Sequence, residues 1–238
     1  MSNKIINILL AAGIFAGLAG CSPETGDTGQ NPVTYEWNGI RNAITPTGER
    51  LLPAEKGPER SALGVPAIDL NNFRLKITGL VDSSYSLSLT EVFTLPEAQT
   101  DTTIMYCVEG WEVWGVWQGV SVKELLDVAR VKPEGKYVLF ICADGYSTCL
   151  PLSYLENYNI MLAYNVNGSP LKSSDGYPLR LISFGKYGYK WAKWINRLKV
   201  IDMYEYGYWE SRGFPDDADV PLYRRQYYEG ENAKPLEY

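Results

Sequence analysis

One cysteine, Cys107, lies in a tryptophan-rich segment. The rest of the chain offers few residues that could act with it as a catalytic base or as a second metal ligand. It stands in the sequence Met-Tyr-Cys-Val-Glu-Gly-Trp, and Trp114 and Trp117 follow shortly after it. The chain has no histidine, which excludes Ser-His-Asp and Cys-His nucleophilic catalysis as well as histidine-ligated zinc, copper and non-haem iron. A lone thiolate then serves either as a redox centre or as the ligand of a soft metal, and the alternative is a buried structural thiol.

A second concentration of reactive groups is a run of cations that contains no acidic residue. Its members are Arg180, Lys186, Lys190, Lys193, Arg197 and Lys199. Within the run, Gly188 precedes Tyr189 and Lys190, and a glycine lets main-chain amides approach an anion closely. We expect a pocket for a phosphate-bearing ligand here. On composition alone, the alternative is a solvated basic face on a pair of strands.

Length and charge bound the class of protein. The chain has 238 residues and a formal net charge of −6, so it is long enough for one well-buried domain and is acidic overall. An acidic surface repels the phosphates of a nucleic acid, and we therefore predict no nucleic-acid partner.

Residues 1–20 have the composition of a secretory signal. Lys4 supplies a positive start, and an apolar run ends in Leu-Ala-Gly-Cys at Cys21. This ending resembles a prokaryotic lipobox, which implies cleavage before Cys21 and acylation of its sulfur; an ordinary signal with an incidental cysteine is the alternative. Two acyl chains hold a protein firmly to a membrane. We expect an extracytoplasmic protein, lipid-anchored on the periplasmic or cell-surface side of a prokaryotic membrane.

The remaining chain divides by composition into three parts. Glycines and prolines punctuate residues 21–62, which we interpret as a lipidated tether followed by an N-terminal wrap around the domain. Residues 63–215 form the main domain, and residues 216–238 form a C-terminal tail.

Periodicity and capping signals within the domain indicate many strands and few, short helices. Apolar and β-branched residues predict strands at 73–79, 137–142, 160–164 and 194–201. Three serines, each followed three positions later by a glutamate, predict helix starts at Ser88, Ser121 and Ser153. Because long βαβ alternation is missing, the pattern predicts a mixed, strand-rich α+β domain. Cys142 and Cys149 flank a short turn, where a disulfide is possible if the strand register aligns them.

Several motifs in order resemble the sulfite oxidase-type molybdopterin-binding domain, from about Val65 to Phe214. They are Phe73-Arg74-Leu75, Cys107-Val108-Glu109-Gly110-Trp111, Asp144-Gly145-Tyr146-Ser147-Thr148, Asn167-Gly168, Gly176-Tyr177-Pro178-Leu179-Arg180-Leu181, Gly188-Tyr189-Lys190 and Gly207-Tyr208-Trp209-Glu210. The resemblance implies that the fold is that of this family and that residues 63–215 are a molybdopterin-binding oxidoreductase domain. It also implies a molybdenum–molybdopterin cofactor.

The resemblance assigns roles to individual residues. Cys107 matches the cysteine whose thiolate ligates molybdenum, as suits a soft metal. Arg180 and the segment Gly188, Tyr189 and Lys190 match the positions that hold the pterin and its phosphate. Asp175 stands where many members have histidine or asparagine. A carboxylate beside a phosphate is repulsive unless it is protonated, paired or turned away.

The segment after Cys107 indicates which substrate is favoured. Sulfite oxidases carry an arginine shortly after the metal cysteine, and here Glu112 and Val113 occupy that neighbourhood. The Cys-Val-Glu-Gly-Trp version is more similar to the bacterial periplasmic members that reduce sulfoxides. We therefore expect oxygen-atom transfer to or from a small or protein-bound, sulfoxide-like substrate. The tryptophans at 111, 114 and 117 would suit a neutral substrate, although we expect at least two of them to be core.

Electrons must be exchanged with another protein, because the sequence has no Cys-x-x-Cys-His motif for a haem of its own. We predict a membrane haem subunit or an exported cytochrome as the electron partner. The signal lacks the twin arginine of folded export, which leaves open an alternative function, a cofactor-free lipoprotein that uses the fold as a binding or scaffold module. A protein that uses Cys107 alone as a redox thiol is disfavoured, because no resolving cysteine is evident.

Overall fold

The computed structural model describes residue 45 and residues 48–96, 98–229 and 233–238, which all belong to one compact unit of the chain. The expected signal segment 1–20 and the expected lipidation site Cys21 lie outside these residues, and both stay predictions. Among the described residues, no helix is long and apolar enough to cross a membrane.

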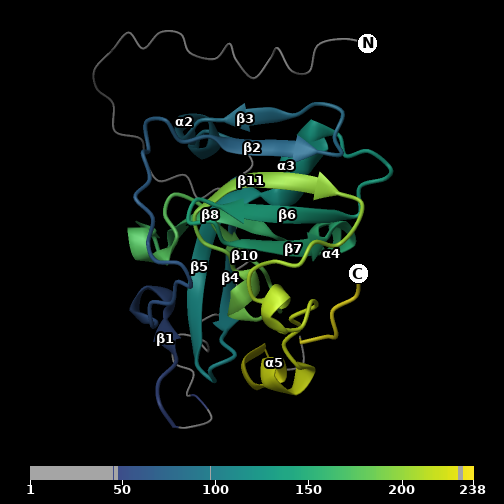
Figure 1. The fold of residues 1–238 in the computed structure, drawn as a ribbon. Coiled ribbons are helices and arrows are strands. Elements are labelled where there is room, and N and C mark those ends of the chain that lie inside the picture. The colour runs from purple at the N-terminus through teal and green to yellow at the C-terminus, as the bar shows by residue number, and fades with distance from the viewer. Residues whose placement is uncertain (1–44, 46–47, 97, 230–232) are drawn as a thin grey trace, which may run out of the picture. The chain divides into compact units, whose positions relative to one another are not determined.

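Two sheets form the framework of the described residues. One is six-stranded, and its members are β1 (Leu52–Pro53), β4 (Ala98–Tyr106), β5 (Glu112–Ser121), β8 (Met161–Val166), β9 (Ser169–Pro170) and β10 (Arg180–Ile182). The other has the order β3 (Tyr85–Leu87), β2 (Leu75–Gly79), β11 (Ile195–Ile201), β6 (Tyr137–Cys142) and β7 (Ser147–Pro151). In Figure 1 the strands of the second sheet run across the direction of β4 and β5.

The four strands predicted from the sequence are present as β2, β6, β8 and β11. Helices are few and short, namely α2 (Leu89–Phe93), α3 (Val122–Ala129), α4 (Leu152–Asn157) and α5 (Leu222–Glu229), with 3-10 turns η2 (Ala54–Lys56), η3 (Ser173–Asp175), η4 (Gly188–Lys190) and η5 (Glu210–Arg212). Together they confirm the predicted α+β class.

The capping signals were right at two of three helices. Ser88 forms a complete capping box with Glu91, and the side chain of Ser121 accepts the amide of Glu124. The third prediction is wrong, because α4 begins at Leu152 after Pro151, and Ser153 lies inside its first turn. Proline holds the extended conformation that precedes a helix, so it ends β7 and starts α4 without a side-chain cap.

The main core joins the second sheet and the short helices to Val120, Leu162 and Leu181 of the first sheet. Leu75 and Ile77 of β2 are completely buried and pack in one cluster with the apolar face of α3, which includes Leu125 and Leu126. Alternation along β2 and the helical spacing along α3 place these side chains on facing surfaces. The helix therefore packs against the β2 region of the second sheet.

A long hairpin, β4–β5, positions the reactive cysteine, and the sequence patterns did not predict it as strands. Its ladder runs without interruption from Ala98 opposite Val120 to Tyr106 opposite Glu112, which leaves Cys107 at the start of the connecting turn. Along β5 the buried residues alternate with half-buried ones, as expected for a strand with one face in a core. Gly115 and Gly119 interrupt the apolar pattern and mask the strand in the sequence.

The possible disulfide between Cys142 and Cys149 is not formed, and both thiols are free and buried. Cys149 pairs in register with Leu139, so the two cysteines are not opposite each other across β6 and β7. They also pack in different clusters, Cys142 in the main core and Cys149 with Leu139 and Ile201. The strand register therefore keeps the two sulfurs apart.

Gly119 is the glycine that the packing of the first sheet requires most clearly. It follows an irregularity in the β5–β8 register, and a Cβ atom there would lie 2.1 Å from the carbonyl oxygen of Leu162 and 2.6 Å from the Cα of Ala163. Both atoms belong to the backbone of β8, so neither can move without disturbing the ladder. The close approach of the two strands depends on the missing side chain.

We predict that Gly119→Ala lowers the free energy of unfolding by about 3 kcal/mol, because the added methyl group forces β5 away from β8. Urea denaturation monitored by tryptophan fluorescence measures the loss. Gly168→Ala is the control, because its Cβ would meet open space and only its positive φ of 78° would be strained, at about 1 kcal/mol. Equal losses for the two variants would contradict the packing argument.

Candidate active site

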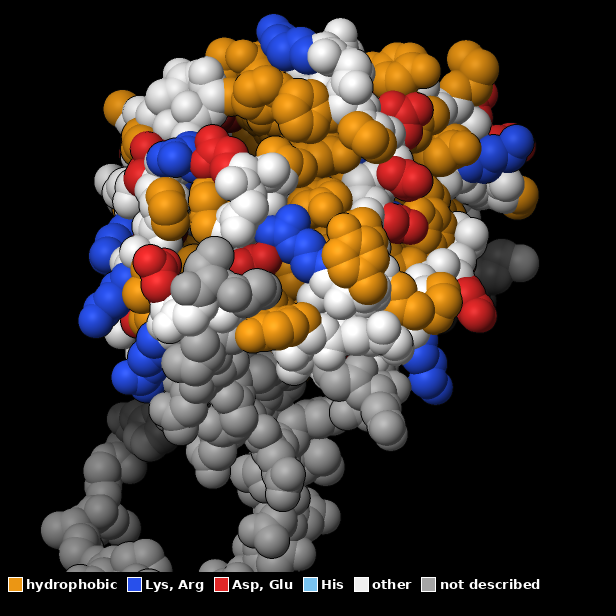
Figure 2. Space-filling view, turned by 90° about the horizontal axis from the view of Figure 1, so that it is seen from below, with side chains coloured by type: hydrophobic (Ala, Val, Ile, Leu, Met, Phe, Trp, Pro, Cys, Tyr) orange, Lys and Arg blue, Asp and Glu red, His pale blue; other side chains and the backbone are white. Residues whose placement is uncertain are grey.

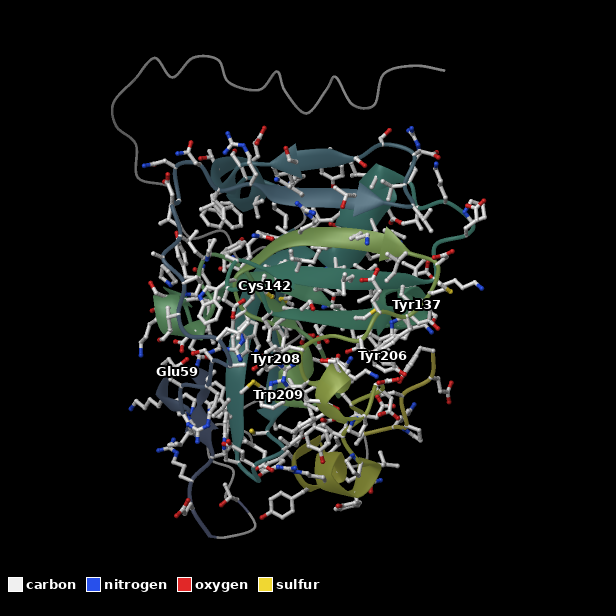
Figure 3. The ribbon with its side chains drawn as sticks, viewed as in Figure 1. Glu59, Tyr137, Cys142, Tyr206, Tyr208 and Trp209 are labelled. Carbon is white, nitrogen blue, oxygen red and sulfur yellow. The ribbon has the colours of Figure 1, made fainter. Side chains whose placement is uncertain are left out.

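A pocket of about 340 Å³ brings together segments that are far apart in the sequence. Its wall is built by residues from the ranges 54–62, 105–117, 144–146, 175–194 and 209–214. After β11, Trp209 lines the pocket, and its ring centroid lies 5.2 Å from that of Tyr208 (Figure 3). Most of the predicted site residues face this one space.

Cys107 lies in the pocket wall at the start of a tight turn. Its amide donates to the carbonyl of Trp111 over 2.8 Å, and its own carbonyl accepts the amide of Gly110 over 3.2 Å. Gly110 has a φ of 96°, a conformation that glycine adopts without strain and that closes the turn. The thiol is partly exposed and accepts the amide of Glu109 over 3.4 Å. Burial raises the pKa of the Cys107 thiol.

The mouth of the pocket beside Cys107 carries charges that neutralise each other. Arg60, from the segment before β2, forms an ion pair of 2.9 Å with Glu109. The same carboxylate accepts the indole N–H of Trp111 over 2.8 Å. These hydrogen bonds hold the pKa of Glu109 below its usual range, so the pair is ionised at neutral pH. The thiol is therefore flanked by a cation and an anion that compensate each other.

Arg180 places a buried cation in the pocket wall. It opens β10 and is only 7% exposed. Its guanidinium donates to the main-chain oxygen of Asp175 and to the sulfur of Met105, each over 3.0 Å, and lies 5.4 Å from the ring centroid of Trp117. Loss of solvent lowers its pKa to about 10. The guanidinium is held by neutral groups, so its charge remains available to an anionic ligand.

Asp175 turns its backbone, and not its carboxylate, to Arg180. Gly176 makes this possible, because its φ of 112° reverses the chain after η3 and leaves room between Arg180 and Lys193. One carboxylate oxygen of Asp175, Oδ2, is buried without a hydrogen-bond partner. The residue thus offers an acceptor to a ligand in the pocket.

Lys193 is a pocket residue that the sequence marked only as one member of the basic run. Its ammonium donates to the carbonyl of Ser174 over 2.7 Å and lies 3.3 Å from the carboxylate of Glu59. Glu59 belongs to the N-terminal segment that passes along one side of β5 in Figure 3. Burial, with the nearby charge of Arg180, lowers the pKa of Lys193 to about 8. Arg180 and Lys193 therefore lie in the same pocket wall, where the repulsion between their charges is unfavourable.

The segment 188–190 divides between the pocket and the interior. Gly188 and Tyr189 line the pocket, but Lys190 does not. Lys190 is completely buried, forms an ion pair with Glu210, and donates to the carbonyl of Cys149 over 3.0 Å. The placement differs from the expectation that Lys190 faces a phosphate, because a buried carboxylate from η5 already compensates its charge.

The same compensation removes most of the predicted basic run from the pocket. Lys186 is buried and pairs with Asp219, and Lys199 lies 3.3 Å from Glu205 outside the pocket. Of the run, Arg180 and Lys193 line the pocket. In the view from below, Lys and Arg side chains stand scattered among hydrophobic and acidic ones (Figure 2). Among the described residues visible in this view, the basic side chains form no broad surface of the kind that binds nucleic acid.

The tryptophans that follow Cys107 have different environments. Trp117 is 1% exposed and belongs both to a core cluster and to the pocket wall. Trp114 packs against a separate cluster, and Trp111 is partly buried at the pocket. Trp117 is therefore both a core residue and a residue of the pocket wall.

Unpartnered polar atoms in the wall show what kind of group the pocket fits. The indole nitrogen of Trp117, Nε of Arg180 and Oδ2 of Asp175 are buried and have no hydrogen-bond partner. Such atoms are costly unless a ligand completes their bonds. No cluster of three potential protein metal ligands occurs among the described residues. A thiol, two hydrogen-bond donors, an acceptor and two cations fit a polar anionic cofactor that brings its own metal ligands.

Comparison with known proteins identifies the family. A family model described as oxidoreductase molybdopterin binding domain matches residues 62–209. A protein of Azospira oryzae named putative protein-methionine-sulfoxide reductase subunit YedZ1 is 35% identical over 150 residues, which are 63% of this chain and 57% of that protein. The uncharacterized oxidoreductase YuiH of Bacillus subtilis is 35% identical over 147 residues, covering 61% of this chain and 74% of YuiH.

More distant relatives share the fold. Rat mitochondrial sulfite oxidase is 27% identical over 192 residues, which cover 67% of this chain and 35% of that enzyme. The crystal structure of the sulfane dehydrogenase SoxCD from Paracoccus pantotrophus aligns with a TM-score of 0.59 at 22% identity, over 86% of this chain and 60% of that chain. The chain thus spans 57% of the Azospira protein and 35% of the rat enzyme.

The chain therefore belongs to the oxidoreductase molybdopterin-binding domain family. Membership of this family implies molybdenum–molybdopterin as the cofactor of the domain. The resemblance, the fold class and the cofactor expected from the sequence are confirmed. The roles of individual residues remain predictions.

We predict that Lys193 makes folding of the cofactor-free protein depend on pH. Its folded pKa of about 8 lies below the ordinary value of 10.5, so the unfolded chain binds more protons between these values and stability rises with pH there. Relative to Lys193→Met, the wild type should gain about 2 kcal/mol between about pH 7.5 and about pH 9.5. Urea denaturation at several pH values measures the difference, and parallel profiles would disprove the shift.

We predict that Lys190 contributes to stability through its buried ion pair. Lys190→Met leaves the buried carboxyl group of Glu210 without its cationic partner and should cost about 3 kcal/mol. Lys199→Met is the matched control, because its pair with Glu205 is exposed and contributes less than about 1 kcal/mol. Chemical denaturation of both variants is the measurement, and a Lys190→Met loss as small as the control would refute this role.

Proposed function

We propose that the protein is a molybdenum-dependent oxidoreductase that transfers an oxygen atom to or from a small or protein-bound substrate, with sulfoxides favoured over sulfite. The observation that carries the proposal is the partly exposed thiol of Cys107 in one pocket with Arg180, Lys193 and unpartnered polar atoms. The thiol and the two cations line the same pocket, as an anionic metal cofactor requires.

The residues present would hold the cofactor by complementary chemistry. Cys107, once deprotonated, would ligate the metal, as soft thiolates do. Arg180 and Lys193 would bind the phosphate, and Asp175 and the indole of Trp117 would bond the polar edge of the pterin. When bound, the cofactor supplies two-electron redox chemistry with oxygen-atom transfer, and the protein supplies orientation and electrostatics.

The electrostatics beside Cys107 favour a neutral substrate. Arg60 is paired with Glu109, and Arg224 of α5 is paired with Glu112. An anion such as sulfite would have to compete with these carboxylates, whereas a sulfoxide has no net charge to compensate. Trp111 contributes an apolar wall at this end of the pocket. The name of the Azospira relative, a putative protein-methionine-sulfoxide reductase subunit, supports the same substrate class for this chain.

Export, membrane attachment and electron transfer complete the proposal. The Leu-Ala-Gly-Cys sequence ending at Cys21 supports a lipid anchor outside the cytoplasm of a prokaryote. The sequence has no haem motif, so we propose a membrane haem subunit or an exported cytochrome as the electron partner. A relative that is named as a subunit agrees with function in a complex.

The decisive experiment measures molybdenum and pterin in the protein without residues 1–20, produced in a cytoplasm that makes the cofactor. We expect near-stoichiometric metal in the wild type. Cys107→Ser should keep the fold but lose the molybdenum redox signal, because serine is a poor ligand for a soft metal. Loaded wild type should then reduce or form sulfoxides with an artificial electron carrier.

The outcome separates the two functions. A folded wild type without metal or pterin under these conditions overturns the enzyme and favours the cofactor-free scaffold. Loaded protein that turns over sulfite faster than sulfoxides overturns only the substrate class. Circular dichroism of Cys107→Ser controls for loss of fold.

A further inference from the structure

The helix α5 lies against the turn that carries Cys107. Arg224 donates from Nη2 to the carbonyl oxygen of Cys107 over 3.2 Å and from Nε to Glu112 over 2.9 Å. On the strand before the turn, the hydroxyl of Tyr106 donates to Glu229 over 3.1 Å. Figure 1 shows α5 beside the ends of β4 and β5. One helix thus contacts the residues on both sides of the turn 107–111.

The turn itself has little else to hold it. Val108 is 49% exposed, and Glu109 and Gly110 are also exposed. Two backbone hydrogen bonds close the turn, the amide of Glu109 donates to the thiol of Cys107, and the indole of Trp111 donates to Glu109. The pair of Glu109 with Arg60 is exposed and hence weak. Segments with few buried contacts open locally at low cost. An external contact on the carbonyl of Cys107 therefore matters for the orientation of the residue.

Arg224 is suited to this contact. Its side chain is 19% exposed and that of Glu112 is 7% exposed, so the pair is shielded from water. Tyr228, also on α5, lies with its hydroxyl 3.4 Å from the second carboxylate oxygen of Glu112. The planar guanidinium bonds two acceptors in a fixed geometry, which a lysine cannot reproduce. Arg224 thereby ties the start of β5 to the carbonyl of Cys107.

We propose that Arg224 is a positioning residue, which fixes the carbonyl of Cys107 so that its thiol is held in the pocket wall for metal ligation. Groups that orient a metal ligand shape the site as much as the ligand itself. The residue lies outside 62–209, the part of the chain that matches the family model. The role in metal ligation rests on the proposed function, whereas the ordering of the turn does not.

The test compares three variants of the protein that comprises residues 21–238. Arg224→Gln removes the guanidinium contacts with Cys107, Glu112 and Tyr187. Arg224→Lys keeps a cation near Glu112 but loses the planar set of donors that bonds two acceptors at once. Arg225→Gln is the matched control, because Arg225 is on the same helix, is more deeply buried, and bonds Glu229 and Lys234 instead of the turn. It reports the effect of weakening α5 and its Glu229 contact with Tyr106, without removing the bond to the carbonyl of Cys107.

The first readout is hydrogen exchange of the amides of Cys107 and Gly110 in cofactor-free protein. We expect about tenfold faster exchange in Arg224→Gln and in Arg224→Lys, equivalent to the loss of one hydrogen bond that stabilises the turn. Arg224→Lys should have nearly wild-type global stability. Arg225→Gln should leave exchange in the turn unchanged once global unfolding has been subtracted.

The second readout is the electron paramagnetic resonance spectrum of molybdenum in loaded protein. Both Arg224 variants should shift it at unchanged metal content, and Arg225→Gln should not. Equal exchange in Arg224→Gln and Arg225→Gln would reduce Arg224 to a structural residue and overturn the proposal. So would faster exchange with an unchanged spectrum. If the wild type binds no metal, the proposed function fails, and the exchange rates still decide whether Arg224 orders the turn.

Discussion

Positive charge buried in the pocket wall is the constraint on which the site depends. Arg180 is almost completely enclosed, and its hydrogen bonds go to a carbonyl and a thioether and not to a carboxylate. Lys193 stands nearby with its pKa lowered to about 8. Buried charges without full compensation destabilise a fold, and they are characteristic of functional sites. Under the proposed function, an anionic cofactor would offset this cost when it binds.

An acidic protein can hold a positive pocket because its other buried cations are neutralised internally. Lys186 is paired with Asp219, and Lys190 with Glu210, so neither contributes its charge to the pocket. The field of Arg180 and Lys193 is therefore confined to a wall of low polarity, where it acts most strongly on a bound phosphate. The partners Asp219 and Glu210 belong to the C-terminal part of the chain, which thereby helps to define the site.

The cations around the pocket differ in how they are compensated. Around Cys107 the cations Arg60 and Arg224 are each paired with a carboxylate, whereas Arg180 makes no ion pair in the described part of the chain. The unpaired charge of Arg180 suits a phosphate. The paired charges around Cys107 suit a substrate that has no net charge. The turn that carries Cys107 connects the strands of a regular hairpin, and Arg180 begins β10 of the same sheet. One sheet therefore positions both residues.

The sequence alone determined the features that depend on local chemistry. The absence of histidine and the ordered motifs led to Cys107 and the family, and alternation and capping placed β2, β6, α2 and α3. Only the tertiary structure decided which cations face the pocket. Lys190 and Lys193 are three residues apart in one basic run, yet one pairs with Glu210 inside and the other meets Glu59 at the pocket. Their partners come from distant segments of the chain. Whether the charge of a lysine is neutralised depends on the side chains that pack against it, and the spacing of residues in the sequence does not show these contacts.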